Sequence, residues 1–384
     1  MIIGIDARML GFGYGLGRYV QQLILHLIRL QTTNTYVLFV QRSDALVESG
    51  MQQEMRNAPN VRIVFADIPW YGWKEQYALI PLLKKERVDL MHFPHWNIPL
   101  LCRGPFVMTI HDLTMFHYPR PEATTWGPIM YWVKDHAHRA VMKSAAHRAA
   151  HIFVTSEYTK QDIHATLHVP EQKMTVTYQA PYTICRPDEQ ENQHILFDRY
   201  GIHEPYILYV GAAYPHKNLE TLMRAWKIYT ETYDTHYDLV LAGKENYFYT
   251  RLKQSALVSG LARQPIFTGL VSDHDLAVLY HHANLFVFPS LYEGFGLPPL
   301  EALVHGVPVI ASERSSLPEV LGEAAVYVDP ESPEDIAARM NEVLRNEDIR
   351  SLLRENAKHE LARYSWDTLA RQTAQQYLHL GAVL

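Results

Sequence analysis

The sequence has few cysteines and lacks a long apolar run, and these absences exclude several classes of protein. Only two cysteines, Cys102 and Cys185, occur among the 384 residues. This count excludes a disulfide framework and a cysteine metal cluster. No run of about 18 apolar residues is present that would cross a bilayer. The first residues, MIIGIDAR, have the pattern of a strand and not of a signal peptide. We therefore expect a cytoplasmic protein.

A strong excess of charge of one sign is also missing. The net charge of −6 argues against a general nucleic-acid binder, so we expect no nucleic-acid partner. The chain is 48% hydrophobic and 20% charged, which is ordinary for a globular protein. Its 384 residues suggest two domains.

The dinucleotide-binding fingerprint is a third absence. The loop GFGYGLGRY, residues 11–19, follows a strand pattern and precedes a helical one, but no G-x-G-x-x-G frame fits its four glycines. The next strand, YVLFVQ, ends without the acid that would bind a ribose. These features argue against a nicotinamide-dependent oxidoreductase. The loop is either a flexible surface turn or a place where backbone approaches a phosphate or sugar closely, and we favour the second interpretation.

Strand patterns alternate with helical patterns along the whole chain. This alternation predicts α/β folding, with parallel sheets covered on both faces. A polar, proline-containing stretch near residues 180–194 separates two series, so we expect two Rossmann-like halves with ligands at the carboxyl ends of their strands. The first series is MIIGIDAR, YVLFVQ, VRIVFAD, DLMHFP, FVMTIHD, HIFVTS and MTVTYQ, and the second is YILYVGAAY, DLVLAGK, PIFTGLV, NLFVFPS, VPVIAS and AVYVDP.

The stretch LYEGFGLPPLEALVHGVPVI, residues 291–310, places Glu293 and Glu301 around a glycine-rich turn. A buried strand pattern precedes it, and residues 298–305 have the pattern of a helix that Gly306 ends. The amides just before this helix lack intrahelical partners and attract phosphate, whereas the two carboxylates accept hydrogen bonds from hydroxyls. A nucleotide sugar offers both groups. The alternative is two acids that the helix dipole favours, with no ligand.

The pair of acids in SDHDL, residues 272–276, invites a metal-binding hypothesis. Ser272 and Asp273, however, directly precede a helical pattern, where they are good N-cap residues. We interpret the segment as a helix cap and expect no metal site.

LYEGFGLPPLEAL resembles the E-x7-E signature of the retaining "group one" glycosyltransferases, which have the GT-B fold. Five further matches follow in order over nearly the whole chain, and the likeness is greatest to the mannosyltransferase-like branch that assembles bacterial surface polysaccharides. These matches are GLGRY, TIHDL, VTSEYTKQDI, YVGAAYPHKNL and FTGLVSDHDL.

The resemblance implies two Rossmann-like domains that face each other across a cleft. Residues 1–183 would form the acceptor domain and residues 184–365 the donor domain. The last helix, residues 366–384, would cross back onto the first domain.

The resemblance also implies roles for single residues. Glu293 would contact hydroxyls of the donor sugar, Glu301 would bind the ribose, and Lys217 would neutralise the leaving diphosphate. His111, Lys217 and Glu293 form the expected catalytic set, in which His111 lies beside the donor sugar. Donor contacts are expected from Gly15, Gly17, Gly211, Lys217, Lys244, Gly269, Val271, Glu293, Phe295, Gly296, Leu297 and Glu301, and acceptor contacts from Tyr14, Arg18 and Asp112.

One position departs from the family pattern. Many relatives place an arginine directly after the glycine that ends the first donor-domain strand, but here Gly211 is followed by Ala212. Lys244 is either a partial substitute for that charge or a solvated surface lysine.

The expected reaction is the metal-independent, retaining transfer of a hexose, foremost mannose from GDP-mannose, to a saccharide or lipid-linked acceptor, without a cofactor. Alternatives are a transferase that uses a UDP- or dTDP-sugar and a non-catalytic nucleotide-sugar-binding protein. A phosphorylase is disfavoured, because the chain is short and shows no evident site for pyridoxal phosphate.

Two stretches of the first half mix aromatic and basic residues. They are WYGWKEQYALIPLLKK, residues 70–85, and residues 126–151, which contain Trp126, Tyr131 and Trp132. Basic amphipathic helices with aromatic residues can lie on anionic bilayers, so peripheral membrane contact is one interpretation. The alternative is a helix packed on a sheet with its aromatic residues buried.

Overall fold

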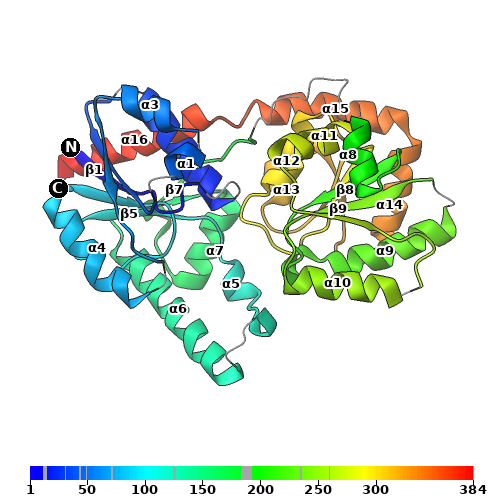
Figure 1. The fold of residues 1–384 in the computed structure, drawn as a ribbon, viewed down its shortest axis with the longest axis horizontal. Helices are drawn as coiled ribbons and strands as arrows, with labels where there is room; N and C mark the ends of the chain where they lie inside the picture. Colours follow the sequence, from blue (N-terminus) through cyan, green and yellow to red (C-terminus); the bar gives the residue numbers. More distant parts are fainter. Residues whose placement is uncertain are drawn as a thin grey trace. The chain divides into compact units, whose positions relative to one another are not determined.

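The fold consists of two compact units, each described here by itself. The computed structural model describes residues 1–11, 15–30, 32–42, 45–48, 50–70, 72–123, 127–182, 193–233, 236–258 and 260–383. Unit 1 comprises Met1–Leu113, Trp126–Gln179 and Ser365–Leu384, and unit 2 comprises Thr114–Thr125 and Ala180–Tyr364 (Figure 1). The domain boundary expected between residues 183 and 184, and most of the expected linker, lie outside the described residues.

Unit 1 is built on a seven-stranded parallel sheet in the order β3-β2-β1-β4-β5-β6-β7 within the described part of the chain. Its strands are β1 (Ile2–Asp6), β2 (Thr35–Val40), β3 (Val61–Phe65), β4 (Leu90–Phe93), β5 (Phe106–Ile110), β6 (His151–Val154) and β7 (Met174–Val176). Its helices are α1 (Leu16–Arg29), α2 (Ala45–Glu48), α3 (Gln52–Asn57), α4 (Trp73–Lys85), α6 (Pro128–Arg148), α7 (Glu157–Leu167), η2 (Glu171–Lys173) and α16 (Trp366–Val383).

The C-terminal helix α16 packs on unit 1, as expected from the sequence. It lies beside α1, where the His26 ring is 2.7 Å from the Asp367 carboxylate. Further along α16, the buried Tyr377 hydroxyl lies 2.5 Å from Nδ1 of His92 on β4. Tyr377 and His92 thus fix the last helix to the centre of the first sheet, although they are far apart in the sequence.

Unit 2 is built on a six-stranded parallel sheet in the order β10-β9-β8-β11-β12-β13 within the described residues. Its strands are β8 (Tyr206–Val210), β9 (Asp238–Ala242), β10 (Ile266–Gly269), β11 (Leu285–Phe288), β12 (Val309–Ser312) and β13 (Ala325–Val328). Its helices are α5 (Thr114–His117), η1 (Pro121–Ala123), α8 (Gln193–Tyr200), η3 (Pro215–Lys217), α9 (Leu219–Thr232), α10 (Tyr247–Val258), α11 (Asp273–His282), α12 (Leu297–Val304), α13 (Leu317–Leu321), η4 (Gly322–Ala324), α14 (Pro333–Arg345) and α15 (Glu347–Leu361).

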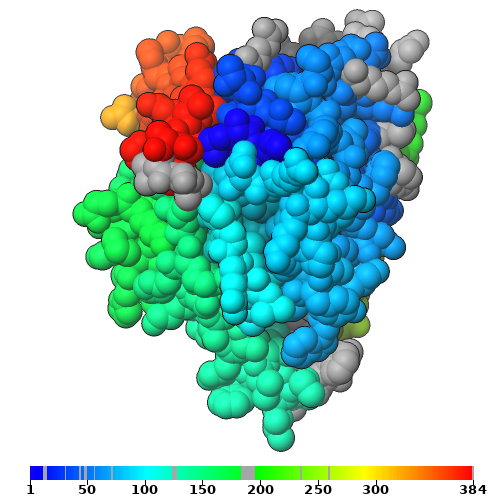
Figure 2. Space-filling view, turned by 90° about the vertical axis from the view of Figure 1, so that its left-hand side faces the viewer, coloured from blue at the N-terminus to red at the C-terminus, as the bar shows by residue number. Residues whose placement is uncertain are grey.

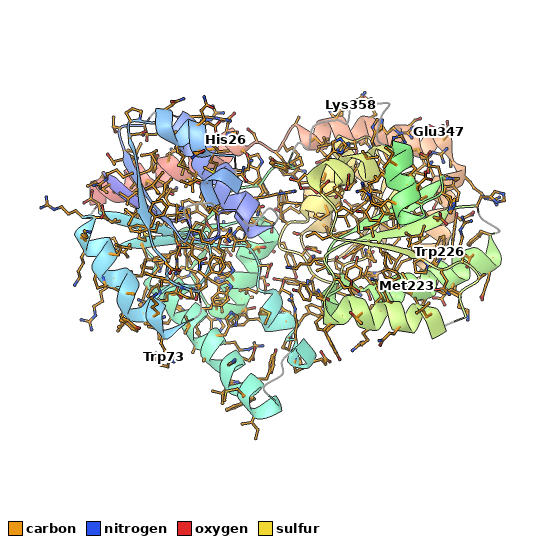
Figure 3. All side chains as sticks on the ribbon, in the orientation of Figure 1. His26, Trp73, Met223, Trp226, Glu347 and Lys358 are labelled. Carbon is orange, nitrogen blue, oxygen red and sulfur yellow. The ribbon has the colours of Figure 1, made fainter. Side chains whose placement is uncertain are left out.

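Every strand that the sequence predicts is present, because most of these strands are buried and form short, mainly apolar runs, whereas β3 is largely exposed. β11 (LFVF) and β9 (DLVLA) are buried along their whole length. Helices complete each core, and Trp226 of α9 is fully buried in unit 2 (Figure 3). Fold class is therefore confirmed for both halves.

The order of strands reverses at one point in each sheet, between β1 and β4 in unit 1 and between β8 and β11 in unit 2. Loops that leave the carboxyl ends of two such strands run to opposite sides and leave room for a ligand. The two switch points therefore indicate where binding residues should be sought.

One segment packs with a different unit from the one expected from the sequence. The described residues 114–123 pack with unit 2, although the sequence-based division placed them in the first half. Helix α6 forms the lower end of the face of unit 1 seen in Figure 2. Among the described helices, none combines the length and apolar character needed to cross a bilayer.

Candidate active site

The switch point of unit 2 brings together two loops that carry opposite charges. Lys217 lies in η3, in the loop after β8, and Glu293 lies in the loop after β11. Lys217 Nζ donates to Glu293 Oε1 at 2.5 Å, and the two side chains are only 18% and 11% exposed. The pair is therefore largely removed from water, where an unpaired charge would be costly.

Neighbouring groups hold the Glu293 loop in place. The Glu293 amide donates to Ser315 Oγ at 2.9 Å, and Ser316 Oγ donates to the Glu293 carbonyl at 3.0 Å. The Leu291 amide donates to the carbonyl of His216 at 2.7 Å, which joins this loop to the loop of Lys217. These bonds hold the loops that carry Glu293 and Lys217 at the carboxyl ends of β11 and β8.

Helix α12 begins four residues after Glu293 and has two prolines in its first turn. Its N-cap residue, Gly296, has φ 93° and ψ 61°, and no side chain of the described residues caps the helix. The first amides of a helix that lacks a side-chain cap, together with the helix dipole, attract an anion. Phe295, Gly296 and Leu297 thus lie where the sequence analysis placed them, beside the Lys217–Glu293 pair.

Glu301 lies in α12 and is almost fully buried, with 6% exposure. The Tyr280 hydroxyl on α11 is 3.1 Å from Glu301 Oε2 and 3.3 Å from the Pro298 carbonyl. A buried carboxylate needs hydrogen-bond donors, and ligand hydroxyls would supply more of them.

Three buried polar atoms at this edge of unit 2 have no hydrogen-bond partner among the described residues. They are Nδ1 of His216, Oγ of Ser290 and the hydroxyl of Tyr249. His216 follows β8, Ser290 follows β11, and the Tyr249 hydroxyl lies 2.9 Å from the Cβ that a side chain at Gly243 would add. Buried polar atoms are usually paired, so their gathering at one sheet edge fits a site that binds a polar ligand.

Three glycines end neighbouring strands in unit 2 and allow a close approach of backbone. The Gly211 amide donates to the Ala242 carbonyl at 2.9 Å, and the Gly243 amide donates to the Gly269 carbonyl at 3.0 Å. A Cβ at Gly243 would lie 2.0 Å from the Gly211 carbonyl oxygen. The sequence analysis missed Gly243, although its position directly after the strand pattern DLVLA could have indicated it.

Lys244, Val271 and the segment SDHDL are the other positions of unit 2 that the sequence analysis considered. Lys244 is exposed directly after Gly243, and Val271 is half-buried after β10. Ser272 caps α11, accepting from the Asp275 amide at 3.0 Å, which confirms that SDHDL is a helix cap. Among the described residues, no cluster of three or more metal-ligating side chains occurs.

In unit 1, His111 ends β5 and has partners at both ring nitrogens. Its Nε2 lies 2.9 Å from the Pro94 carbonyl, and its Nδ1 lies 3.3 Å from the Gln179 side-chain amide. The carbonyl can only accept, so Nε2 carries the proton and Nδ1 accepts from Gln179. Burial lowers the pKa of His111, which the Pro94 carbonyl and Asp112 oppose. The ring is thus a neutral, oriented imidazole.

The other first-half predictions lie in the segments that follow β1 and β5. Gly17 is buried and Arg18 half-buried in α1, Gly15 is exposed with φ 58° just before α1, and Asp112 is half-buried after His111. Tyr14 lies outside the described residues. Roles in acceptor or donor binding stay predictions for all of these positions.

A buried ionic network at the switch point of unit 1 was missed from the sequence. Arg8, fully buried after β1, donates to Asp6 at 2.6 Å and to Glu75 of α4 at 2.5 Å, and Asn97 donates to both oxygens of Glu75. Burial raises the pKa of Glu75, whereas Arg8 and Asn97 lower it. Asp6 and Asn97 also line a small pocket with His95, so the network supports a polar surface there.

Comparisons with known proteins identify the family of the chain. Residues 194–360 match the family described as glycosyl transferases group 1, and residues 14–180 match Glycosyltransferase Family 4. Together the two ranges span most of the chain. The chain belongs to the group 1 glycosyltransferases.

Similar proteins include one curated relative and two solved structures. The O-antigen chain mannosyltransferase RfbU of Salmonella typhimurium is 28% identical over 302 residues, which are 78% of this chain and 76% of that protein. Sucrose-phosphate synthase from Thermosynechococcus elongatus has a TM-score of 0.73 at 20% identity and covers 100% of this chain and 99% of its own. HepE of Anabaena in complex with UDP-glucose has a TM-score of 0.70 at 15% identity, covering 98% and 99%. The two structures show that this glycosyltransferase has the GT-B fold.

The geometry of Gly296 leads to a stability prediction. Gly296→Ala should lower the free energy of unfolding by about 1–3 kcal/mol, because φ 93° is unfavourable for alanine. Its new Cβ would also lie 2.7 Å from Leu317 Cδ2, so some further loss is expected. Urea unfolding followed by circular dichroism measures the change.

Gly306→Ala is the matched control at the other end of α12. Gly306 also has positive φ, 75°, but no atom lies within 4 Å of the position its Cβ would take. Gly306→Ala should lower the free energy of unfolding by less than Gly296→Ala does. Equal losses would show that the contact with Leu317 does not restrict the turn.

Proposed function

We propose that this glycosyltransferase moves mannose from GDP-mannose to a saccharide or lipid-linked acceptor of a cell-surface polysaccharide, with retention of configuration. The observation that carries the proposal is the Lys217–Glu293 pair beside the start of α12, with Glu301 further along the same helix. Ammonium and helix amides suit a diphosphate, and the carboxylates suit hydroxyls of the sugar and the ribose.

Mannose is proposed because the chain is similar to RfbU, whose name describes an O-antigen chain mannosyltransferase. A nucleotide sugar as donor has further support from HepE, a GT-B structure in complex with UDP-glucose. The alternative functions are transfer from a UDP- or dTDP-sugar and nucleotide-sugar binding without catalysis, and a screen of nucleotide sugars distinguishes them.

The proposed reaction breaks the bond between the anomeric carbon and the diphosphate oxygen and forms the acceptor bond on the same face. The leaving diphosphate takes the proton of the acceptor hydroxyl, so no carboxylate nucleophile is required. Lys217 Nζ has three protons, and can donate to a phosphate oxygen while it stays bonded to Glu293. Catalysis then rests on positioning and on stabilisation of the leaving charge.

A membrane-facing surface is part of the proposal and involves α4 and α6. Trp73 on α4 is 88% exposed (Figure 3), and Ile129 and Trp132 on α6 are 80% and 59% exposed. Trp126 lies outside the described residues. The exposure of Trp73 and Trp132 supports the membrane interpretation, whereas Trp70 and Tyr131 are half-buried.

The two helices are joined by the loop after β4. The Leu100 amide donates to Gln76 of α4, and Arg148 of α6 donates to the carbonyls of Leu100 and Cys102. Figure 2 shows this side of unit 1, with α6 at its lower end. Exposed lysines on both helices, Lys74, Lys84, Lys85, Lys134 and Lys143, would attract an anionic bilayer from the cytoplasmic side.

The donor assignment is tested by a screen of nucleotide sugars with Glu301→Ala. The wild type should hydrolyse or transfer mannose from GDP-mannose, and the variant should raise the donor KM by about tenfold to a hundredfold, as expected for a lost charged hydrogen bond. A 2′,3′-dideoxy donor, which lacks the ribose hydroxyls, should barely distinguish the two proteins.

Glu342→Ala is the control for this screen, because Glu342 is an exposed glutamate on α14 that pairs with Arg339. It should behave like the wild type. An unchanged KM for Glu301→Ala would remove the ribose role. If the protein turns over only a UDP- or dTDP-sugar, that sugar would replace GDP-mannose as the assigned donor. Binding of a nucleotide sugar without any turnover would support the non-catalytic alternative.

Activity should persist in EDTA, because Lys217 and the amides at the start of α12 would take the place of a divalent ion at the diphosphate. Initial rates before and after chelation measure this. Loss of activity that magnesium or manganese restores would instead return Asp273 and Asp275 to consideration as metal ligands.

The full chain should co-sediment with vesicles that contain phosphatidylglycerol, and less so as salt rises. Replacing both Trp73 and Trp132 by alanine should weaken binding at least about tenfold, since burying one large apolar side chain contributes ~1.5–3 kcal/mol. Leu352→Ala, at an equally exposed site of unit 2, is the control. Equal binding by both variants would exclude this surface.

A further inference from the structure

A short segment between two elements of unit 1 belongs to the donor half. β5 and α6 are parts of unit 1, but the described residues 114–123 between them, which form α5 and η1, pack with unit 2. The sequence analysis assigned no role to this segment. Its aromatic and cation–π contacts include both loops that carry Lys217 and Glu293.

Aromatic rings connect the segment to both loops. The ring centroids of His117 and Tyr292 are 5.1 Å apart, and the ring of Tyr118 lies 6.1 Å from Tyr292 and 6.1 Å from His216. Tyr292 directly precedes Glu293, and His216 directly precedes Lys217. The segment therefore reaches both members of the ion pair through their immediate neighbours.

Arg120 brings a positive charge to the same place. Its guanidinium carbon lies 3.6 Å from the centroid of the Tyr214 ring, a close cation–π contact. Tyr214 in turn stacks on His216, with ring centroids 5.9 Å apart and an interplanar angle of 16°. Both Arg120 and Lys217 add to the effect of burial in lowering the pKa of His216 to about 2, so both charges act on this one ring.

The charges of the donor site require a further cation. Among the donor-site residues expected from the sequence, only Lys217 and Lys244 are positive. Lys217 is paired with Glu293, and Glu301 adds a buried carboxylate. A diphosphate would therefore meet a site with no surplus of positive charge from these side chains, apart from the exposed Lys244. Arg120 corrects this balance, because a guanidinium that stacks on an aromatic ring also suits planar hydrogen bonding to phosphate oxygens.

We propose that Arg120 is a donor-binding residue that contacts the diphosphate of the nucleotide sugar, and that residues 114–123 form part of the donor site. This inference rests on the proposed function, because it requires a nucleoside diphosphate ligand. His117 and Tyr118 are positioning residues, which hold the loops of Lys217 and Glu293 through Tyr292 and His216.

Calorimetric titration of the full chain with GDP, UDP and dTDP tests the proposal, with the nucleoside of the tightest ligand as a phosphate-free probe. Arg120→Ala should weaken diphosphate binding at least about tenfold, as for a lost charged hydrogen bond, and leave nucleoside binding unchanged. Arg120→Lys keeps the charge and should recover part of the affinity. The affinity of Arg120→Ala should also depend less on salt than that of the wild type.

Arg251→Ala is the matched control, because Arg251 is an exposed arginine of unit 2 that pairs with Glu220. It should bind like the wild type, and circular dichroism checks that all variants are folded. Tyr118→Ala, which removes a positioning ring, should lower kcat more than it raises the Kd for the diphosphate.

The outcomes separate this inference from the proposed function. A wild type that binds none of the three diphosphates would contradict the proposed function itself. If the wild type binds and Arg120→Ala binds equally well, the donor site stands without Arg120, and a loss in Lys244→Ala would identify the cation instead. An equal loss of diphosphate and nucleoside by Arg120→Ala would show that the residue only supports Tyr214.

Discussion

The ion pair between Lys217 and Glu293 is the contact on which the candidate site of unit 2 depends. Both side chains are largely buried, so removing either partner would leave a charge that the surroundings cannot solvate. The pair forms only if the loops after β8 and β11 stay at a fixed separation. β8 and β11 are neighbours in the sheet, and their loops are further joined by the bond from the Leu291 amide to the His216 carbonyl. The backbone of the sheet thus sets the geometry of the charges.

Buried polar groups gather at both switch points. At that of unit 1, Arg8 is surrounded by Asp6, Glu75 and the Ile68 carbonyl, and Asn97 completes the network. A network of this kind makes a rigid scaffold, since each charge already has its partner. At that of unit 2, His216, Ser290 and Tyr249 each have a buried polar atom that lacks a protein partner among the described residues. The unpaired atoms of unit 2 therefore suit this edge to bind a polar ligand.

The fold was predictable because its signal is local. A strand buried on both faces must be apolar over its whole length, and a helix between two such strands follows from chain connectivity. The positions of Lys217 and Glu293 in the loops after β8 and β11, and of Glu301 in the helix that follows, were also predictable, because these residues lie in recognisable motifs. The cap at Ser272 could be read from four adjacent residues.

The contacts that sequence reasoning missed join residues distant in the chain. Arg8 and Glu75 are 67 positions apart, and nothing near either residue indicates its partner. Arg120 lies between two prolines in the stretch HYPRPE, which reads as an ordinary polar turn. That this turn packs with unit 2, beside Tyr214, depends on tertiary packing. The same is true of Gly243. A side chain at this position would clash with the carbonyl of Gly211, which follows a neighbouring strand.

The pairing of Glu293 also bears on how retention would be achieved. A carboxylate that is bonded to an ammonium group at 2.5 Å is stabilised, and its oxygen is correspondingly less nucleophilic. His111, as a neutral imidazole with both nitrogens engaged, is likewise arranged to orient rather than to attack. Because Glu293 is tied to Lys217 and the His111 ring is engaged at both nitrogens, neither residue is arranged as a nucleophile for the sugar carbon. The arrangement instead favours electrostatic stabilisation of a departing diphosphate, in which fixed charges need little reorganisation as the bond breaks.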